Sequence, residues 1–431
     1  MRVSKLFAKT VVMLARSRLT IPLRAVLRRA RESYYNIEVL NRIQTKTAAL
    51  SLQVDVEEDE RVNILLPEIN FDNFYGGYIA KFNLALKMVA SGRRVRFVIV
   101  DQCNVDMPRW RDMVSAYEGL GGIFESVEVG YHFDRSVPLA VNPGDAFVAT
   151  TWWTAFIADA ALSHLNQDQF IYLIQEYEPF TFPMGSYFAQ AHASYDLPHR
   201  GLFSTELLRD YFRRNKIGYN FGATRYAEDQ TVSFENAIIS YAGNELTLSE
   251  RRPAKLLFYS RPESHATRNM FEIGYQALAA SIEAGIFGGD WEFHGIGSSH
   301  GDIPLPHENI LKMLGKVDLD TYRALLPQYD IGLSLMYTPH PSLLPLEMAA
   351  AGAIVVTNEC LNKTHVELQS ISGNILAARP TIDGVMKELR EAAVRVHDYD
   401  RRIANSQVNW ATSWDVTFDH GVINVLNDWI G

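Results

Sequence analysis

Cysteine is scarce in this chain of 431 residues: only Cys103 and Cys360 occur, and neither belongs to a CxxC pair or a Cys/His cluster. A disulfide scaffold is therefore excluded, and two unpaired thiols are expected. Long apolar runs are also missing, because no stretch reaches the roughly 18 uncharged residues of a membrane-spanning helix. With 47% hydrophobic and 21% charged residues, the chain has a globular composition and is too long for one core, so at least two domains are expected.

Several well-known motifs are absent. No G-x-G-x-x-G follows the first predicted strand, and neither G-x-x-x-x-G-K-[ST] nor G-x-S-x-G occurs. These absences argue against a dinucleotide-dependent dehydrogenase, a P-loop NTPase and an α/β-hydrolase. Asp318-Leu-Asp320 has the Asp-x-Asp form of metal-dependent sugar transferases, but it directly precedes an amphipathic helix, where Asp is a normal N-cap. We therefore expect a helix cap, no bound metal and no cofactor.

The net charge of −9 conceals an uneven distribution. Residues 1–32 carry nine basic and one acidic side chain, so the other 399 residues hold 32 basic and 49 acidic groups, a formal −17. That acidic body would repel nucleic acid. On a helical wheel the arm separates its apolar side chains, Val3, Phe7, Val11 and Leu14, from its basic ones, Arg2, Lys5, Lys9 and Arg16. We predict a cytoplasmic protein held peripherally on the anionic inner face of the cell membrane. A disordered basic tail and a cleaved signal peptide are the alternatives.

Short apolar runs alternate with helical periodicities in two successive series. The first begins at RVNILLP (61–67) and ends at GLFS (201–204), and the second runs from KLLFYS (255–260) to AIVVTN (353–358). Further predicted strands lie at 95–101, 124–130, 145–151, 170–175, 291–297 and 329–336. Two βα series predict an α/β protein with two doubly wound Rossmann-like domains facing across a cleft.

The expected boundaries follow from these patterns. An amphipathic helical arm covers residues 1–50, and the two domains cover 51–241 and 242–412. Residues 242–254 are polar and punctuated by Gly and Pro, as is typical of a linker. The last residues, 413–431, are predicted to form a C-terminal helix that packs back on the N-terminal domain.

The most informative segment is YTPHPSLLPLEMAAAGAIVVTN (337–358), which reads as a strand end, an irregular loop, a helix start and a strand. Pro345 suits the first helical turn, where free amides form a site for anions and hydroxyls. Glu347 lies in the same turn, where a carboxylate is favoured. A simple helix-start charge is the plainer interpretation of that glutamate.

This segment resembles the donor-site signature of family-4 glycosyltransferases of GT-B fold, E-G-F-G-L-P-x-x-E-A-M-A-x-G-x-P-V-I-A-T. Gly76-Gly77 resembles the family's glycine loop, LLFYSRP (256–262) its strand with a phosphate-binding Arg, and FHGIGS (293–298) its h-h-G-x-G turn. The stretches NILLPEINFDNFYGGYIAKFNLAL and SLMYTPHPSLLPLEMA are most similar to bacterial dTDP-rhamnose-dependent rhamnosyltransferases of the WsaF type.

The resemblance implies a metal-independent, retaining hexosyltransferase that moves rhamnose from dTDP-rhamnose to a growing, lipid-linked surface polysaccharide. The N-terminal domain would bind the acceptor and the C-terminal domain the nucleotide-sugar. Glu347 would hold sugar or ribose hydroxyls, while Arg261 and Lys316 would bind pyrophosphate; these three are the predicted catalytic residues. The implied donor-binding set is Gly76, Gly77, Arg261, Arg268, Gly295, Lys316, His340, Ser342, Leu343, Leu344 and Glu347.

The sequence departs from the family pattern at three places. The first Glu of the Glu-x7-Glu pair falls at Pro339, beside His340, so recognition of sugar hydroxyls there must differ. The Lys that follows the phosphate Arg is missing, and either Arg268 or Lys316 would substitute for it. A solvated loop charge is the alternative role of both residues. TTWWTA (150–155) replaces the region of the family's N-domain His.

Candidate acceptor residues follow two strands of the first series. Trp152, Trp153 and Tyr177 could stack on sugar rings, although core packing is the plainer role. Glu176 and Glu178 follow a strand end, where ligand clefts form, and would supply a carboxylate base if the reaction inverted. Exposed loop acids are the alternative interpretation of these two residues. A GT-B epimerase or phosphorylase, or a non-catalytic glycan-binding subunit, is the alternative function.

Overall fold

The computed structural model describes residues 41–71, 74, 76–222, 227–241, 248–249, 253–298 and 300–431. The predicted arm, apart from its last residues, and most of the predicted linker lie outside this range. Residues 49–431 form one compact unit, and the description below concerns that unit.

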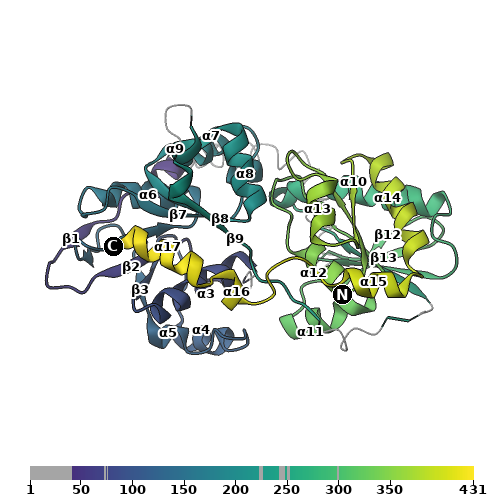
Figure 1. Ribbon diagram of the computed structural model, residues 1–431, viewed down its shortest axis with the longest axis horizontal. Helices are drawn as coiled ribbons and strands as arrows, with labels where there is room; N and C mark the ends of the chain where they lie inside the picture. The colour runs from purple at the N-terminus through teal and green to yellow at the C-terminus, as the bar shows by residue number, and fades with distance from the viewer. Residues whose placement is uncertain are drawn as a thin grey trace, which may run out of the picture. The chain divides into compact units, whose positions relative to one another are not determined.

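The first sheet is built entirely from parallel strands, in the order β4-β3-β2-β6-β7-β8-β9. Its strands are β2 (Arg61–Leu66), β3 (Arg94–Ile99), β4 (Val127–Tyr131), β6 (Ala146–Ala149), β7 (Phe170–Ile174), β8 (His199–Ser204) and β9 (Thr231–Phe234). Its helices are α3 (Gly76–Ala90), α4 (Met107–Val114), α5 (Ile123–Ser126), α6 (Trp152–Leu162), α7 (Ser186–Ala193), α8 (Glu206–Asn215) and α9 (Gly218–Phe221) (Figure 1). A separate parallel pair joins β1 (Leu52–Val54) to β5 (Leu139–Val141).

The second sheet has the order β12-β13-β11-β10-β14-β15-β16, and only the β12–β13 pair is antiparallel. Its strands are β10 (Ala254–Tyr259), β11 (Trp291–Ile296), β12 (Ile303–Pro304), β13 (Ile310–Met313), β14 (Ile331–Leu333), β15 (Ile354–Asn358) and β16 (Ile375–Ala378). Its helices are α10 (Phe271–Glu283), α11 (Leu319–Leu325), α12 (Leu344–Ala350), α13 (His365–Ile371), α14 (Ile382–Arg395) and α15 (Tyr399–Asn405). The two predicted Rossmann-like domains are thus confirmed.

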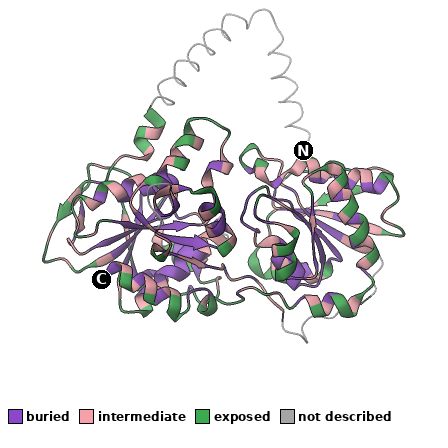
Figure 2. Cartoon of the chain, turned by 45° about the horizontal axis from the view of Figure 1, so that its top comes forward, coloured by how far each residue is buried: buried purple, intermediate pink, exposed green. Residues whose placement is uncertain are grey.

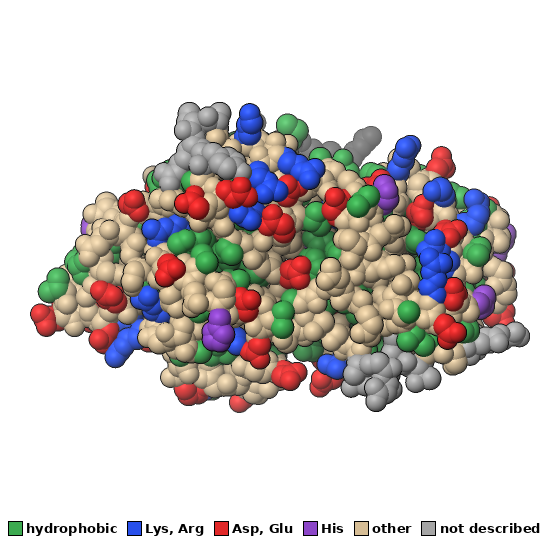
Figure 3. Space-filling view, in the orientation of Figure 1, with side chains coloured by type: hydrophobic (Ala, Val, Ile, Leu, Met, Phe, Trp, Pro, Cys, Tyr) green, Lys and Arg blue, Asp and Glu red, His purple; other side chains and the backbone are tan. Residues whose placement is uncertain are grey.

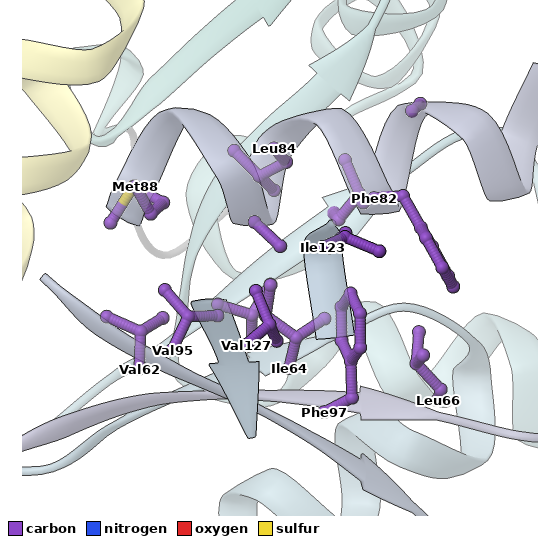
Figure 4. Close-up of a cluster of buried hydrophobic side chains, with 14 of the residues drawn as sticks. Val62, Ile64, Leu66, Phe82, Leu84, Met88, Val95, Phe97, Ile123 and Val127 are labelled. Atoms are coloured by element: carbon purple, nitrogen blue, oxygen red, sulfur yellow. The ribbon is translucent and has the colours of Figure 1, made fainter. Parts of the chain in front are cut away.

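The strands of both sheets are nearly continuous runs of apolar residues. Such runs are expected because helices cover both faces of each sheet. The strands are buried while most helices expose one side (Figure 2). On one face of the first sheet, Phe82, Leu84 and Met88 of α3 pack onto Ile64 and Phe97 of the central strands (Figure 4). Burying each such side chain stabilises the fold by about 1.5–3 kcal/mol.

The chain returns to the first sheet at its C-terminus, through α16 (Trp414–Thr417) and α17 (His420–Ile430). Ile423 and Leu426 join the same buried cluster as α3, and Arg93 donates from Nε to Oδ1 of Asn427 at 3.0 Å. Figure 1 shows this last helix lying along the first sheet.

Two expectations about elements were wrong or incomplete. The predicted strand at 124–130 begins only at Val127, because residues 123–126 form the short helix α5. The region 359–405, which the sequence reading leaves unassigned, contains strand β16 and helices α13 to α15.

Candidate functional site

The strand orders identify where a ligand would bind. In the first sheet the order reverses between β2 and β6, and in the second between β10 and β14. Ligands of doubly wound folds bind beyond the carboxyl ends of the strands at such switch points. The glycine loop after β2, the Arg261 loop after β10 and the 337–347 segment after β14 are therefore all at the expected places.

The start of α3, which contains Gly76, contacts the loop before α12, which contains Leu343, so residues of the two sheets meet here. A Cβ atom placed on Gly76, the first residue of α3, would lie 2.6 Å from Cδ1 of Leu343. The next glycine is also closely approached, since the Gly77 carbonyl accepts a hydrogen bond from Nε2 of Gln175 at 3.1 Å. Glycine is needed here so that the backbone of α3 can lie against the loop of the second sheet.

Glu347 is partly buried in the first turn of α12. Its Oε2 atom accepts a 2.6 Å hydrogen bond from the Tyr322 hydroxyl, and its Oε1 atom accepts one from the Ile239 amide at 3.3 Å. Burial raises the pKa of the Glu347 carboxyl group, and the two hydrogen bonds oppose that rise. These two hydrogen bonds fix the orientation of the carboxylate, and each oxygen keeps a further lone pair that can accept a hydrogen bond.

Arg261 follows β10 and is held by its own neighbours. Its guanidinium group contacts Glu263 Oε2 and the Tyr259 hydroxyl, each at 3.4 Å, and His265 Nε2 at 3.0 Å. Gly297 lies beside both Tyr259 and Arg261: φ there is +103°, and a Cβ would lie 2.5 Å from Cε2 of the Tyr259 ring and 3.2 Å from Cδ of Arg261. This glycine is the second of the quoted turn and was not among the predicted residues.

Gly295, which was predicted to bind the donor, lies inside β11. A Cβ at that position would overlap the sulfur of Met313 on the neighbouring strand β13. Its lack of a side chain therefore serves packing within the sheet, and Gly297 is the glycine at the strand end.

The two candidate substitutes for the missing Lys differ in position. Arg268 is partly buried, and its carbonyl accepts from the Tyr337 amide at 2.7 Å. Burial raises the pKa of Glu176 and lowers that of His340, and the Arg268 charge opposes the first shift and adds to the second. Lys316 is exposed, between β13 and α11. Figure 3 shows basic and acidic side chains interspersed over one face of the surface.

His340 is buried, with 6% of its surface exposed. Its Nδ1 accepts from the Ser342 amide at 3.0 Å, and its Nε2 lies 3.4 Å from Oγ of Ser204 in the first domain. Burial lowers its pKa to about 3, with help from Lys363 and Arg268, so the ring is neutral. Because both nitrogens already have protein partners, His340 orders the loop, and its predicted contact with the donor is not supported.

The remaining donor residues lie at the entrance to α12. Ser342 adopts a left-handed backbone, with φ of 66°, and so turns the chain toward Leu343 and Leu344. The carbonyl of Leu343 accepts from the amides of Leu346 and Glu347, which begins the helix.

Two predicted acceptor residues belong to the core of the first domain. Trp152 is only 1% exposed and packs edge-on against Trp153, and Tyr177 is 4% exposed with its hydroxyl 2.8 Å from Nδ1 of His192. Neither ring has a free face for a sugar, so the predicted stacking was wrong for these two. Trp153 is partly buried.

Glu176 and Glu178 follow β7 and are both partly buried. Burial raises the pKa of Glu178 to about 7, while the Trp152 amide and Lys81 oppose that rise and Glu176 adds to it. Burial also raises the pKa of Glu176, against the opposing charges of Arg268 and Lys363 and hydrogen bonds from the Tyr177 amide and Thr338. Charged groups of both sheets therefore meet beside the 337–347 segment.

Three residues that contact the site were not predicted from the sequence: Tyr322, Lys363 and Gly297. Nothing in the sequence distinguishes Tyr322 as a site residue, because several aromatic residues lie on amphipathic helices. Lys363 lies in the unassigned region, and Gly297 could have been found from the quoted G-x-G turn.

Among the described residues no three His, Cys, Asp or Glu side chains form a group that could hold a metal ion. Asp318 is a helix cap, as predicted: its Oδ1 accepts from the Thr321 amide at 2.9 Å. Both cysteines are free thiols. The part of the chain that the structure describes contains no helix long and apolar enough to cross a membrane.

Solved structures share this two-sheet architecture. Anabaena HepE, crystallised with UDP and glucose, superposes with a TM-score of 0.54 and 12% identity, over 86% of this chain and 98% of HepE. WaaG, a glycosyltransferase involved in lipopolysaccharide biosynthesis, gives 0.51 and 13%, over 86% and 99%. At such identities the likeness concerns the fold, which is that of the GT-B glycosyltransferases.

Family models specify the class further. The WsaF N-terminal domain matches residues 61–205 and the WsaF C-terminal domain matches residues 254–390, together more than half of the chain. The chain belongs to the WsaF family of GT-B glycosyltransferases. It is 30% identical over 367 residues to the O-antigen biosynthesis protein RfbC of Myxococcus xanthus, covering 83% of this chain and 26% of RfbC. The chain thus spans about a quarter of that relative's length.

Proposed function

We propose that this protein transfers a sugar from a nucleoside diphosphate sugar to a growing surface polysaccharide. One observation carries the proposal: the glycine start of α3 and the loop before Glu347 meet at the switch points of the two sheets, with Leu343 against Gly76. Family membership, the polysaccharide role in the name of RfbC and the UDP bound to HepE support the same chemistry.

The residues at this place suit a pyrophosphate leaving group. Glycosyl transfer leaves extra negative charge on the nucleotide, and guanidinium groups and backbone amides can stabilise it. Arg261 and Arg268 lie between β10 and α10, and Ser342 and Leu343 directly precede α12. We propose that Arg261, Arg268 and Lys316 bind the phosphates without a metal ion and that Glu347 binds sugar or ribose hydroxyls.

We further propose dTDP-rhamnose as the donor, a lipid-linked glycan as the acceptor and retention at the anomeric carbon, on the basis of the sequence resemblance. The acceptor would lie beside Trp153, Glu176 and Glu178. Should the reaction invert instead, Glu178 is the candidate base, because a carboxyl group with a pKa of about 7 is half ionised near neutral pH.

The basic arm would bring the enzyme to its acceptor. Residues 1–32 carry a formal +8, and about 1 kcal/mol of attraction per basic residue is available at an anionic leaflet. We propose that they hold the protein peripherally on the inner face of the cell membrane.

A thermal-shift screen of nucleotide-sugars tests the central claim. A ligand at 100 times its Kd stabilises the folded state by about 2.7 kcal/mol. We expect dTDP-rhamnose to raise the melting temperature most, and proton NMR of the first product formed on a glycan acceptor to show the retained anomer. Failure of all nucleotide-sugars to bind would favour a glycan-binding subunit, and turnover without an acceptor would reveal an epimerase or phosphorylase.

A further inference from the structure

Lys363 is a fully buried lysine, with 0% of its surface exposed, in the turn between β15 and α13. Its Nζ atom donates to the carbonyl oxygen of Met336 at 2.9 Å and lies 3.4 Å from that of His340. Its backbone is fixed as well, since its amide and carbonyl exchange hydrogen bonds of 2.8 and 2.9 Å with Cys360. The ammonium group is therefore held against the segment that leads to Glu347.

That segment, residues 336–342, has no regular secondary structure and is mostly buried. Its carbonyl groups consequently need partners from elsewhere, because a buried carbonyl without a hydrogen bond is costly. Besides Lys363, the Met336 carbonyl accepts from Nδ2 of Asn358 at 3.1 Å, and the His340 carbonyl accepts from Oγ1 of Thr338 at 3.2 Å. Lys363 is the charged donor that joins the two ends of the segment.

A buried ammonium group is costly unless it is compensated. In the described part of the chain, no carboxylate forms an ion pair with Lys363, so backbone carbonyls are its direct partners. An uncharged side chain would fill this space at less cost if packing were its whole purpose. The ammonium charge therefore has a role beyond packing, which is to hold the loop through the carbonyl groups of Met336 and His340.

We propose that Lys363 is a positioning residue for donor binding: it clamps the loop 336–342 so that Leu343 and Glu347 face the donor. This inference rests on the proposed function, because it takes the loop to be part of the donor site. It extends that function to a residue outside every motif quoted from the sequence, on a turn after β15.

The charged and titratable groups around the clamp come from several elements. Cys360 lies on the same turn, His340 on the clamped loop, Arg268 after β10 and Glu176 after β7. Burial lowers the pKa of Lys363 to about 8, while the charges of Cys360 and Glu176 oppose the fall. The pKa values of Cys360, about 11, and of His340, about 3, place their titrations outside the range from pH 7 to 9.

The test compares Lys363→Met with Lys387→Met, which removes an exposed lysine of α14. Lys363→Met leaves the Met336 carbonyl two partners, Asn358 Nδ2 and the Thr338 amide, and the His340 carbonyl one, so we expect it to fold, with a cooperative melting transition as the check. Losing a charged hydrogen-bond donor should raise the Kd and the KM for dTDP-rhamnose about tenfold or more, and kcat should fall much less. Amide hydrogen exchange in residues 336–343 should accelerate, while Lys387→Met should leave every readout unchanged.

The pH dependence supplies a second readout. In the wild type, donor affinity should fall as the pH rises through about 8, because the ammonium group loses its charge. In Lys363→Met this alkaline decrease should vanish. Should the decrease persist in the variant, or should exchange in the loop and donor KM match the wild type, the positioning role is refuted. Should the wild type itself bind no nucleotide-sugar, the proposed function fails first, and the exchange measurement still decides whether Lys363 orders the loop.

Discussion

Replacing Tyr322 tests the role of Glu347 without altering the carboxyl group. The Tyr322 hydroxyl donates to Oε2 at 2.6 Å, and the other donor found in the described chain, the Ile239 amide, is at 3.3 Å. A hydrogen bond to a charged group contributes about 1.5–3 kcal/mol, which corresponds to about 10- to 150-fold in an equilibrium constant. Since Ile239 still orients the carboxylate, we expect Tyr322→Phe to weaken dTDP-rhamnose binding near the lower limit, by about tenfold.

The effect of Tyr322→Phe should depend on pH in a defined direction. Burial raises the pKa of Glu347 and the Tyr322 hydrogen bond opposes it, so removing the hydroxyl raises that pKa further. A protonated carboxyl accepts fewer hydrogen bonds from a sugar, so the loss of affinity should grow as the pH falls from 8 to 5.5. Isothermal titration calorimetry of dTDP-rhamnose across this range measures it.

Tyr275→Phe is the matched control for this experiment. It removes a hydroxyl that donates to the carbonyl of Pro304 at 2.8 Å, in the same domain but away from Glu347. It should leave donor affinity unchanged. Unchanged affinity in a folded Tyr322→Phe protein at every pH would refute the claim that Glu347 binds the donor through this arrangement.

Three further predictions follow from the structure and the sequence. Arg261→Ala should reduce turnover by about 100-fold or more through lost charge stabilisation, and steady-state kinetics near the wild type would remove Arg261 from the site. Arg402→Met should lower the free energy of unfolding by about 3–5 kcal/mol, because it removes the guanidinium group that lies 3.2 Å from the carboxylate of buried Asp330; denaturant titration measures this against Arg401→Met, an exposed neighbour. Deleting residues 1–32 should release the protein from anionic vesicles in a sedimentation assay, and unchanged binding would contradict the membrane role.

The central strands could be predicted because burial on both faces leaves a plain apolar signal. The predicted run 61–67 corresponds to β2 at Arg61–Leu66, and 353–358 to β15 at Ile354–Asn358. Helix α14 also had a readable signal, since Val385, Leu389 and Ala392 are buried at helical spacing, yet the sequence reading passed over it. The short strand β16 had none, because four apolar residues fit a helix or a strand equally well.

Only the parts of the site that short contiguous motifs form could be predicted from the sequence. The loop before Glu347 and the position of Arg261 follow from short contiguous patterns. The burial of His340, by contrast, depends on Ser204, which lies 136 residues earlier in the first domain. Trp152 and Tyr177 look accessible in the sequence because they follow strand ends, but helices α6 and α7 and their aromatic neighbours enclose them.

The two partners of Glu347 differ in what can move them. Tyr322 belongs to α11, within the same domain as Glu347, so its hydroxyl keeps its place whatever the first sheet does. Ile239 lies on the segment between β9 and β10, which joins the two sheets. The loss of affinity in Tyr322→Phe therefore measures what the Tyr322 hydroxyl contributes, because the Ile239 amide and the other proposed donor contacts remain. A large loss would mean that the second domain orients the carboxylate through Tyr322, and a small loss that the Ile239 amide of the connecting segment is enough to orient it.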